Sequence, residues 1–287
     1  MRYAQIYSRL LSSPWFIDET TLTAITTLLE SRMNSALPGR AAGGLARRKP
    51  VAHDDNPDLE GSDDEEDDPC PLPEIPGVSV IRMFGVLGKH LSALEMACGG
   101  CDMDAIARQV DQAMADPAVQ KVVLYIDSPG GMAIGCHELF THLFQSKTKP
   151  LYAYTDVLCG SAAYYIASAA DALFVAPTAR VGSIGTLLMV CDASKAYEEQ
   201  GVKFTLLKSG EWKGLGDPRV PMSKEGLAIL QNLVDKLGSQ FRADVMKSRP
   251  SVDKADMEGL AYLGADAVER KLADGVVLDL ATFLKGI

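Results

Sequence analysis

The chain has 287 residues, of which 47% are hydrophobic and 23% are charged, and its formal net charge at pH 7 is -10. This length predicts one large domain with an appendage, and the apolar fraction is enough for a sizeable core. No apolar run approaches the roughly 20 residues that a membrane-spanning helix needs, and residues 1–11 lack the features of a signal peptide. We therefore expect a cytoplasmic protein without a membrane span.

The six cysteines are scattered along the chain, which excludes a disulfide framework. Cys98 and Cys101 form a single CxxC pattern, but no second pair stands at the spacing of a zinc site. We interpret both as free thiols, and we expect neither a metal nor another cofactor.

Residues 1–33 are expected to form a helical leader. Asp18 or Thr20 is a suitable cap for a run that places Leu22, Ile25, Leu28 and Leu29 on one face. Trp15 and Phe16 just before it are interpreted as a hydrophobic anchor, which packs either on the main domain or on a partner.

The acidic charge is concentrated in one segment. Ten acidic residues and no Lys or Arg lie between Asp54 and Asp68. Residues 34–76 are also rich in Pro and Gly, so like charges repel and few apolar groups offset the entropy of ordering. This segment is predicted to be a disordered linker. The remainder holds 27 acidic and 24 basic residues, without the basic patch that nucleic-acid binding would require.

The third segment, residues 77–287, is predicted to be the folded domain. Strands and helices alternate along it, which is typical of an α/β fold with parallel strands. We expect strands over 78–83, 121–126, 151–154, 172–176, 204–207 and 276–278. Helices are expected over 102–115, 134–145, 162–170 and 224–246, and further elements over 256–263 and 265–273.

Ser161 stands in a turn of small residues at the start of an apolar helix. It is either the cap of that helix or an exposed nucleophile. The four histidines, at positions 53, 90, 137 and 142, all precede it. The usual downstream histidine is therefore absent, and the general base is sought among His137 and His142, on the helix after the glycine turn, and the lysines. Cys159, two residues earlier, is interpreted as a small buried residue and not as a nucleophile.

A glycine turn, Asp127-Ser128-Pro129-Gly130-Gly131, follows the apolar run 122–126. Paired glycines permit backbone conformations closed to other residues and the close approach of another chain. Their N–H groups, together with that of Ala162, are suited to stabilise the negative charge of a tetrahedral intermediate. The alternative is an ordinary turn from strand to helix.

A lysine is the physical alternative to histidine as the base, because burial can lower its pKa from about 10.4 toward neutrality. The downstream candidates are Lys195, Lys203, Lys208, Lys213 and Lys224. Lys213 stands out because it lies in a glycine-rich loop, residues 209–218, directly after the expected strand 204–207.

Four motifs resemble, in order, those of the signal peptide peptidase A (protease IV) family of serine–lysine peptidases. They are residues 127–131, 161–167 and 181–185, and Gly210-Glu211-Trp212-Lys213 with Pro218. The resemblance covers roughly residues 78–287. It implies a Clp protease/crotonase-like fold of repeated ββα units, and makes residues 77–287 a serine peptidase domain.

The resemblance also implies the role of each site residue. Ser161 would be the nucleophile, Lys213 the general base, and Ser183 the residue that orients the lysine. The amides of Gly131 and Ala162 would form the oxyanion hole, with Gly130 in support.

Two positions depart from the family pattern, and the first of them favours one branch, as do the expected absence of a membrane anchor and the 76-residue leader. Ala162-Ala163 stands where the family often has two glycines, and Asp127 where it often has asparagine. The alanine form resembles the head-maturation (prohead) proteases of tailed phages. This implies a coat or scaffold protein as substrate, in the host cytoplasm or the prohead, and small or apolar side chains next to the cut.

The resemblance implies as well a homo-oligomeric ring, in which a neighbouring subunit sometimes supplies the lysine. Ala41-Ala42-Gly43-Gly44 is a candidate self-cleavage site. The alternatives are a bacterial cytoplasmic protease like signal peptide peptidase, a crotonase-like enzyme acting on acyl-CoA, and a non-catalytic assembly protein.

Overall fold

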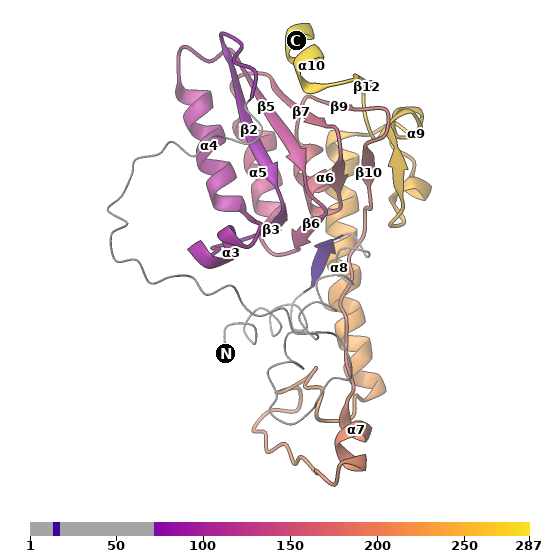
Figure 1. The fold of residues 1–287 in the computed structure, drawn as a ribbon. Coiled ribbons are helices and arrows are strands. Elements are labelled where there is room, and N and C mark those ends of the chain that lie inside the picture. The colour runs from indigo at the N-terminus through magenta and orange to yellow at the C-terminus, as the bar shows by residue number, and fades with distance from the viewer. Residues whose placement is uncertain (1–13, 18–71) are drawn as a thin grey trace, which may run out of the picture.

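The computed structural model describes residues 14–17 and 72–287, and it shows a mixed α/β domain built on a parallel sheet (Figure 1). Five strands lie in the order β12-β9-β7-β5-β2, and every neighbouring pair is parallel. They are β2 (Val78–Phe84), β5 (Lys121–Asp127), β7 (Leu151–Thr155), β9 (Ala172–Val175) and β12 (Gly275–Val276). The predicted α/β class with parallel strands is confirmed.

Helices cover both faces of this sheet, because alternate side chains of each strand point in opposite directions. Val122, Leu124 and Ile126 of β5 belong to the large core beneath the helices on one face. These helices are α4 (Met103–Ala115), α5 (Cys136–Ser146), α6 (Ala162–Ala167) and the last turns of α8 (Lys224–Ser248). Val123 and Tyr125 face the other side, where α10 (Leu280–Gly286) covers them. Burial on both faces is the usual setting of a parallel sheet.

Each of the first four strands of this sheet along the chain continues into a short strand that turns out of the sheet. β3 (Val86–Gly88), β6 (Gly130–Met132), β8 (Leu158–Gly160) and β10 (Arg180–Gly182) follow β2, β5, β7 and β9 respectively. β6 then leads to α5, and β8 to α6. The short strands form two small sheets, in the orders β1-β6-β3-β4 and β11-β10-β8. Their other members are β1 (Trp15–Ile17), β4 (Gly100–Asp102) and β11 (Ala261–Leu263).

Several predicted elements differ in their ends. The helix expected over 162–170 ends at Ala167 as α6. The element expected over 256–263 divides into a 3-10 helix, Lys254–Met257, and β11, and α9 covers Gly264–Glu269. α4 begins as expected, because Asp102 caps it by accepting a hydrogen bond of 2.9 Å from the Ala105 N–H. The helix α10 was not predicted.

The leader contributes β1 to the domain. Trp15, Phe16 and Ile17 are 7%, 2% and 2% exposed. Of the two alternatives for Trp15 and Phe16, packing on the main domain is the one observed. The helix expected after Asp18, and the linker as far as residue 71, lie outside the described residues. Leu72 and Ile75, at the end of the predicted linker, pack against the cluster beneath α10.

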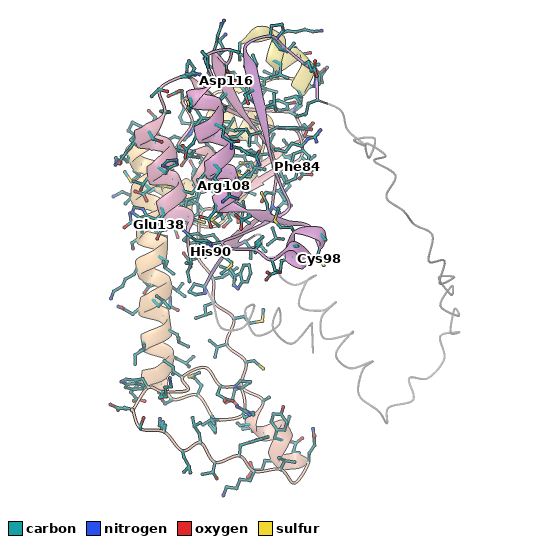
Figure 2. The ribbon with its side chains drawn as sticks, turned by 90° about the vertical axis from the view of Figure 1, so that its left-hand side faces the viewer. Phe84, His90, Cys98, Arg108, Asp116 and Glu138 are labelled. Carbon is teal, nitrogen blue, oxygen red and sulfur yellow. The ribbon has the colours of Figure 1, made fainter. Side chains whose placement is uncertain are left out.

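Residues 188–223 and the first turns of α8 extend away from the sheets, and we call this region the arm (Figures 1 and 2). It also holds the short helix α7 (Ser194–Glu199). The strand predicted over 204–207 is wrong, since these residues have no regular structure and Leu207 is 89% exposed. A strand needs a neighbour for its backbone hydrogen bonds, and the sheets of the domain lie away from this segment.

Within the described part of the chain, no helix is both long and apolar enough to cross a membrane.

Candidate active site

Ser161 lies between β8 and α6 with φ at +52°. This backbone conformation is uncommon for a residue with a Cβ atom, and such strain gathers at functional sites. The Ser161 N–H donates to the Gly182 carbonyl oxygen over 2.7 Å, and its own carbonyl accepts from the Tyr165 N–H over 2.8 Å. The hydroxyl makes no capping hydrogen bond to α6. Ser161 therefore occupies the N-cap position of α6, but its hydroxyl does not cap the helix.

Two hydrogen bonds join the glycine turn to the strand that leads to Ser161. The Ser128 N–H donates to the Leu158 carbonyl oxygen over 2.8 Å, and the Gly160 N–H to the Ser128 carbonyl oxygen over 3.0 Å. The Ser128 hydroxyl accepts from the Gly130 N–H over 3.2 Å and donates to the Gly85 carbonyl oxygen over 2.6 Å. The glycine turn is thereby held beside Ser161.

Neighbouring backbone atoms leave no room for a side chain at either glycine of this turn. Gly130 has φ at +100°, and a Cβ atom there would lie 2.9 Å from the Ala162 nitrogen. A Cβ atom on Gly131 would lie 2.0 Å from the Leu87 carbonyl oxygen. The structure thus brings Gly130, Gly131 and Ala162 together beside Ser161.

The Ala162 N–H is the first of helix α6. No hydrogen-bond acceptor for it is found within residues 14–17 and 72–287. A helix N-terminus leaves such groups free for an anion. This N–H is therefore available to a negatively charged oxygen formed at a carbonyl that Ser161 attacks. The Gly130 N–H, in contrast, is already bonded to Ser128.

Ser183 lies in the turn directly after Gly182, the residue that accepts from the Ser161 N–H. It also has a positive φ, +54°, and its N–H donates to the Leu260 carbonyl oxygen over 2.7 Å. Ser183 lines a cavity of about 540 Å³ whose other walls include Ile17, Leu187 and Arg242. The cavity leaves room beside Ser183 for a side chain from another part of this chain or from another copy of it.

Lys213 is not brought to this site within the chain. It is exposed, in a turn of the arm where its N–H donates to the Gly210 carbonyl oxygen over 3.1 Å. That turn adjoins the start of α8, because Leu215 lies beside Gly226. The helix α6, which follows Ser161, contacts α8 much nearer to the C-terminal end of α8. There the rings of Tyr165 and Phe241 stack with their centroids 4.3 Å apart. The two contacts are separated by about 22 Å along α8, at about 1.5 Å per residue.

The three histidines within the described residues each lie beside a carboxylate. His137 Nδ1 lies 2.7 Å from Asp244 Oδ2, His142 Nε2 lies 2.7 Å from Asp111, and His90 Nδ1 lies 2.8 Å from Asp104. Among the described residues, no histidine hydrogen-bonds to Ser161. This leaves the predicted lysine as the candidate base.

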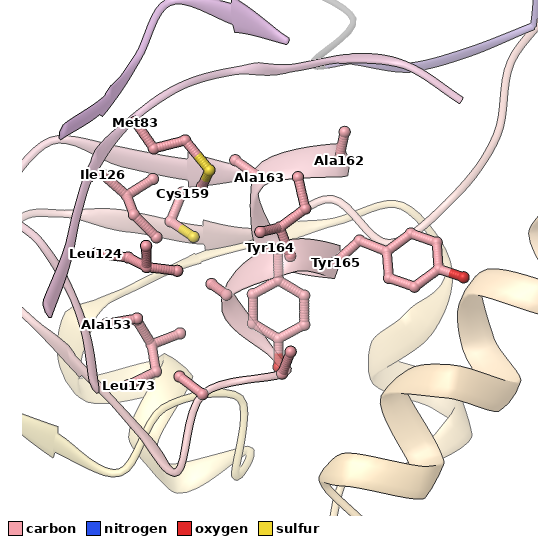
Figure 3. Close-up of a cluster of buried hydrophobic side chains, with 14 of the residues drawn as sticks. Met83, Leu124, Ile126, Ala153, Cys159, Ala162, Ala163, Tyr164, Tyr165 and Leu173 are labelled. Atoms are coloured by element: carbon pink, nitrogen blue, oxygen red, sulfur yellow. The ribbon is translucent and has the colours of Figure 1, made fainter. Parts of the chain in front are cut away.

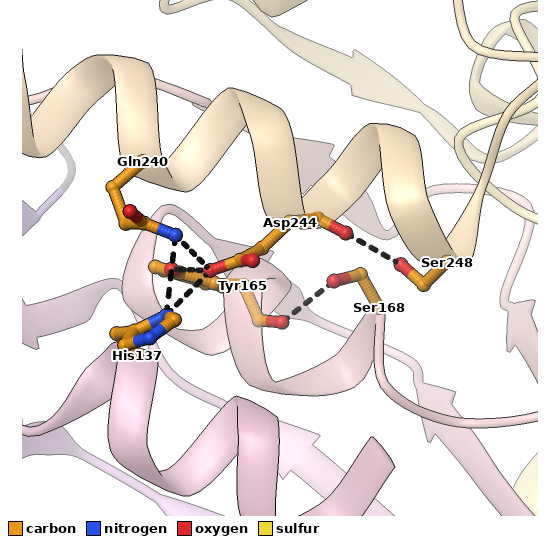
Figure 4. Close-up of polar contacts among 6 residues, drawn as sticks. All are labelled: His137, Tyr165, Ser168, Gln240, Asp244 and Ser248. Carbon is orange, nitrogen blue, oxygen red and sulfur yellow. Dashed lines mark hydrogen bonds and ion pairs between the residues drawn. The ribbon is translucent and has the colours of Figure 1, made fainter. Parts of the chain in front are cut away.

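A polar network that joins α6 to α5 and α8 was not predicted. Asp244 on α8 accepts hydrogen bonds from the Tyr165 hydroxyl of α6 and from Gln240, and it pairs with His137 of α5 (Figure 4). Burial alone raises the pKa of Asp244, but the hydrogen bonds from Tyr165, Gln240 and His137 outweigh burial and hold it below its ordinary value. The only sequence signal for this network was the helical spacing of Gln240 and Asp244.

The two tyrosines that follow Ala163 point in different directions (Figure 3). Tyr165 points toward α8, whereas the Tyr164 hydroxyl donates to the Leu272 carbonyl oxygen over 3.0 Å. Both side chains are fully buried. They fix α6, and with it the turn of Ser161, from two sides.

Of the cysteines that the structure describes, Cys101, Cys136 and Cys159 are buried. Cys159 is fully buried in the core, and burial raises the pKa of its thiol, as the prediction of a structural role requires. Cys101 is also buried, which raises its pKa to about 11, while Cys98 is exposed. The described residues contain no group of three or more metal-ligating side chains.

Comparison with known proteins identifies the family. Residues 143–281 match peptidase family S49, and this range contains Ser161, Ser183 and Lys213. Capsid assembly protease C of Escherichia phage lambda is 32% identical over 204 residues, which are 70% of this chain and 46% of the relative. Head-tail preconnector protein GP5 of Enterobacteria phage P21 is 32% identical over 206 residues, 70% of this chain and 41% of the relative.

A plant protein is a third relative. The chloroplastic serine protease SPPA of Arabidopsis thaliana is 25% identical over 205 residues, which are 69% of this chain and 30% of the relative. The chain thus spans less than half the length of each of these three proteins.

Proposed function

Because the chain belongs to peptidase family S49, we propose that it is a serine endopeptidase with a Ser161–Lys213 dyad. The observation that carries this proposal is the turn of Ser161. Its strained backbone, its hydroxyl that makes no capping hydrogen bond, and the Ala162 N–H that has no acceptor within residues 14–17 and 72–287 stand together beside a glycine turn. The paired strands that turn out of the parallel sheet also support the Clp protease/crotonase-like fold expected from the motifs.

The reaction follows from these positions. The Ser161 hydroxyl attacks a peptide carbonyl carbon while neutral Lys213 accepts its proton. The carbonyl oxygen becomes an anion, which accepts hydrogen bonds from the N–H groups of Ala162 and Gly131. Lys213 then gives the proton to the leaving amine, and water activated by the same lysine hydrolyses the acyl-enzyme.

The position of the arm supports supply of Lys213 by a second copy of the chain. Lys213 lies far from Ser161 within one chain, and the cavity beside Ser183 offers space for a lysine from outside. Ser183 would then hold its ammonium group. The arm also exposes apolar side chains that have no cover in the described chain, and contiguous exposed apolar surface marks an interface. They include Leu207, Trp212, Leu227, Ile229 and Leu233.

The proposal for the substrate rests on the two phage relatives. Two of them are named for capsid assembly and for the head-tail preconnector. We therefore propose that this chain cleaves coat or scaffold proteins during head maturation, within the host cytoplasm or the prohead. The segment 41–44 remains a predicted self-cleavage site, and intact masses of aged wild-type and Ser161→Ala protein test it.

A serine-directed acylating probe tests the enzyme itself. The full chain should gain one probe mass on Ser161, whereas Ser161→Ala should gain none. Ser168→Ala is the matched control, because Ser168 is buried near the end of the same helix with its hydroxyl bonded to the Tyr165 carbonyl oxygen. Failure of the wild-type chain to label would favour the non-catalytic assembly protein, and turnover of acyl-CoA would favour the crotonase alternative.

A further inference from the structure

The strand β1 of the leader lies beside the candidate active site, between β6 and the segment that holds Leu187. On one side it pairs antiparallel with β6, which begins at the glycine turn, with Phe16 opposite Gly131 and Ile17 opposite Gly130. On the other side Trp15 exchanges two hydrogen bonds with Leu187, of 2.9 Å and 3.0 Å. A short segment from far away in the sequence is thus bonded along both edges.

This strand also reaches the groups predicted to form the oxyanion hole. A Cβ atom on Gly130 would lie 2.2 Å from the Phe16 carbonyl oxygen and 2.9 Å from the Ala162 nitrogen. Both atoms therefore lie against the same side of Gly130. The Phe16 carbonyl is thus in the neighbourhood where a substrate carbonyl would have to lie for attack by Ser161.

With β1 paired to β6, a peptide from another chain cannot reach the position beside Ser161. Ser161 is only 1% exposed. The opposite edge of β6 is paired with β3, so within the described chain the edge that β1 covers is where a further strand would add. The Phe16 ring packs against Tyr165 and Phe241, with ring centroids 5.8 Å and 5.0 Å apart.

We propose that residues 14–17 are a blocking strand, which fills in cis the position that the main chain of an extended peptide substrate takes beside Ser161. Peptides commonly bind by adding a strand to the edge of a sheet, where main-chain hydrogen bonds give affinity and side-chain pockets give specificity. A substrate must then displace the strand, and a segment with an aromatic side chain matching Phe16 competes best. The inference rests on the proposed function, because it takes Ser161 as the nucleophile.

A reversible covalent lock distinguishes blocking from a merely structural role. The Ala133 N–H donates to the Pro14 carbonyl oxygen over 3.2 Å, so the alternation of the ladder makes Trp15 and Met132 a non-hydrogen-bonded pair, about 4.5 Å apart between Cα atoms. This separation suits a disulfide, which spans about 4.4–6.8 Å. The double variant Trp15→Cys with Met132→Cys should therefore hold the strand in place when oxidised and release it when reduced.

We expect the reduced double variant to cleave fluorescent casein at least tenfold faster than the oxidised form. Met132→Cys alone, treated with the same oxidant, controls for oxidation of the exposed Cys98 and Cys191 and should show no such difference. Equal, measurable rates of cleavage in the two states of the double variant would overturn the proposal, because a purely structural strand is unaffected by being tied down.

A binding measurement needs no catalysis. In the Ser161→Ala background, a fluorescein-labelled peptide with the sequence of residues 13–18, Ser-Pro-Trp-Phe-Ile-Asp, should bind the reduced double variant at least tenfold more tightly than the oxidised one. Equal binding in both states, or binding in neither, would overturn the proposal. Binding confined to the reduced form, with casein cleaved in neither state, would support the blocking strand and count against the proposed peptidase.

Discussion

The N–H of Ser161 donates to the carbonyl oxygen of Gly182, the residue just before Ser183, over 2.7 Å. This bond joins the turn of the proposed nucleophile to the turn of the residue predicted to hold the lysine. Both serines have a positive φ, +52° for Ser161 and +54° for Ser183. The two turns therefore form one rigid unit, and a change in one is expected to show in the chemistry at the other.

Substitution of Ser183 tests the role of its hydroxyl. Ser183→Ala should lower kcat about tenfold to a hundredfold, because the lysine loses the group that orients it. A fall of this size is at the low end of the rate enhancement that acid–base catalysis contributes. KM should change little, since the hydroxyl does not bind the substrate. Steady-state kinetics with a fluorogenic peptide measure both constants. An unchanged kcat would show that Ser183 does not act on the base, and a fall in the melting temperature would point to a structural role.

Gly130→Ala should abolish peptide cleavage and destabilise the chain. A methyl group there would collide with the Phe16 carbonyl oxygen and the Ala162 nitrogen, and the positive φ adds strain of about 1–3 kcal/mol. Urea unfolding and casein cleavage measure the two effects. Gly286→Ala is the control, because a Cβ atom on Gly286 would meet nothing within 4 Å. Full activity in Gly130→Ala would contradict the placement of the oxyanion site.

The network beneath α6 predicts a dependence of stability on pH. Asp244 has a pKa held below its ordinary value of 3.8 in the folded chain. Its contribution is therefore fully present above pH 4 and is lost as the pH falls through the folded value. Asp244→Asn should cost about 1–3 kcal/mol at pH 7, through weakened hydrogen bonds to a buried group, and less at pH 3.

Urea unfolding at the two pH values measures this difference. Asp235→Asn is the matched control, because Asp235 is exposed on the same helix and accepts only from Gln231 among the described residues. A cost of Asp244→Asn that grows as the pH falls would contradict the direction given for the pKa of Asp244.

Much of the domain was predictable because its strands are buried on both faces. The runs 122–126 and 151–154 are continuously apolar, as is usual for parallel strands that are buried on both faces. The strand predicted over 204–207 failed because the pattern of Phe204 to Leu207 suits a sheet edge, but the arm carries these residues away from any sheet. The sequence pattern of a short segment does not show which other segments it meets in the fold.

The site was predictable to a similar degree. Ser161, Ala162 and the two glycines were placed together because each stands at the end of a neighbouring parallel strand. The network of Tyr165 and Asp244 was not, since these residues are 79 positions apart. The pairing of β1 with the glycine turn was equally hidden, because three apolar residues beside a predicted helix carry no signal for a strand.

Mixed oligomers of Ser161→Ala and Lys213→Ala test most directly whether a second copy completes the site. Each variant alone should be inactive. Co-expressed with different tags and purified through both, they should recover about a quarter of the wild-type activity per site, because random mixing along a head-to-tail interface places an intact Ser161 beside an intact Lys213 at about one site in four. No recovery, beside an active wild-type chain, would contradict the account.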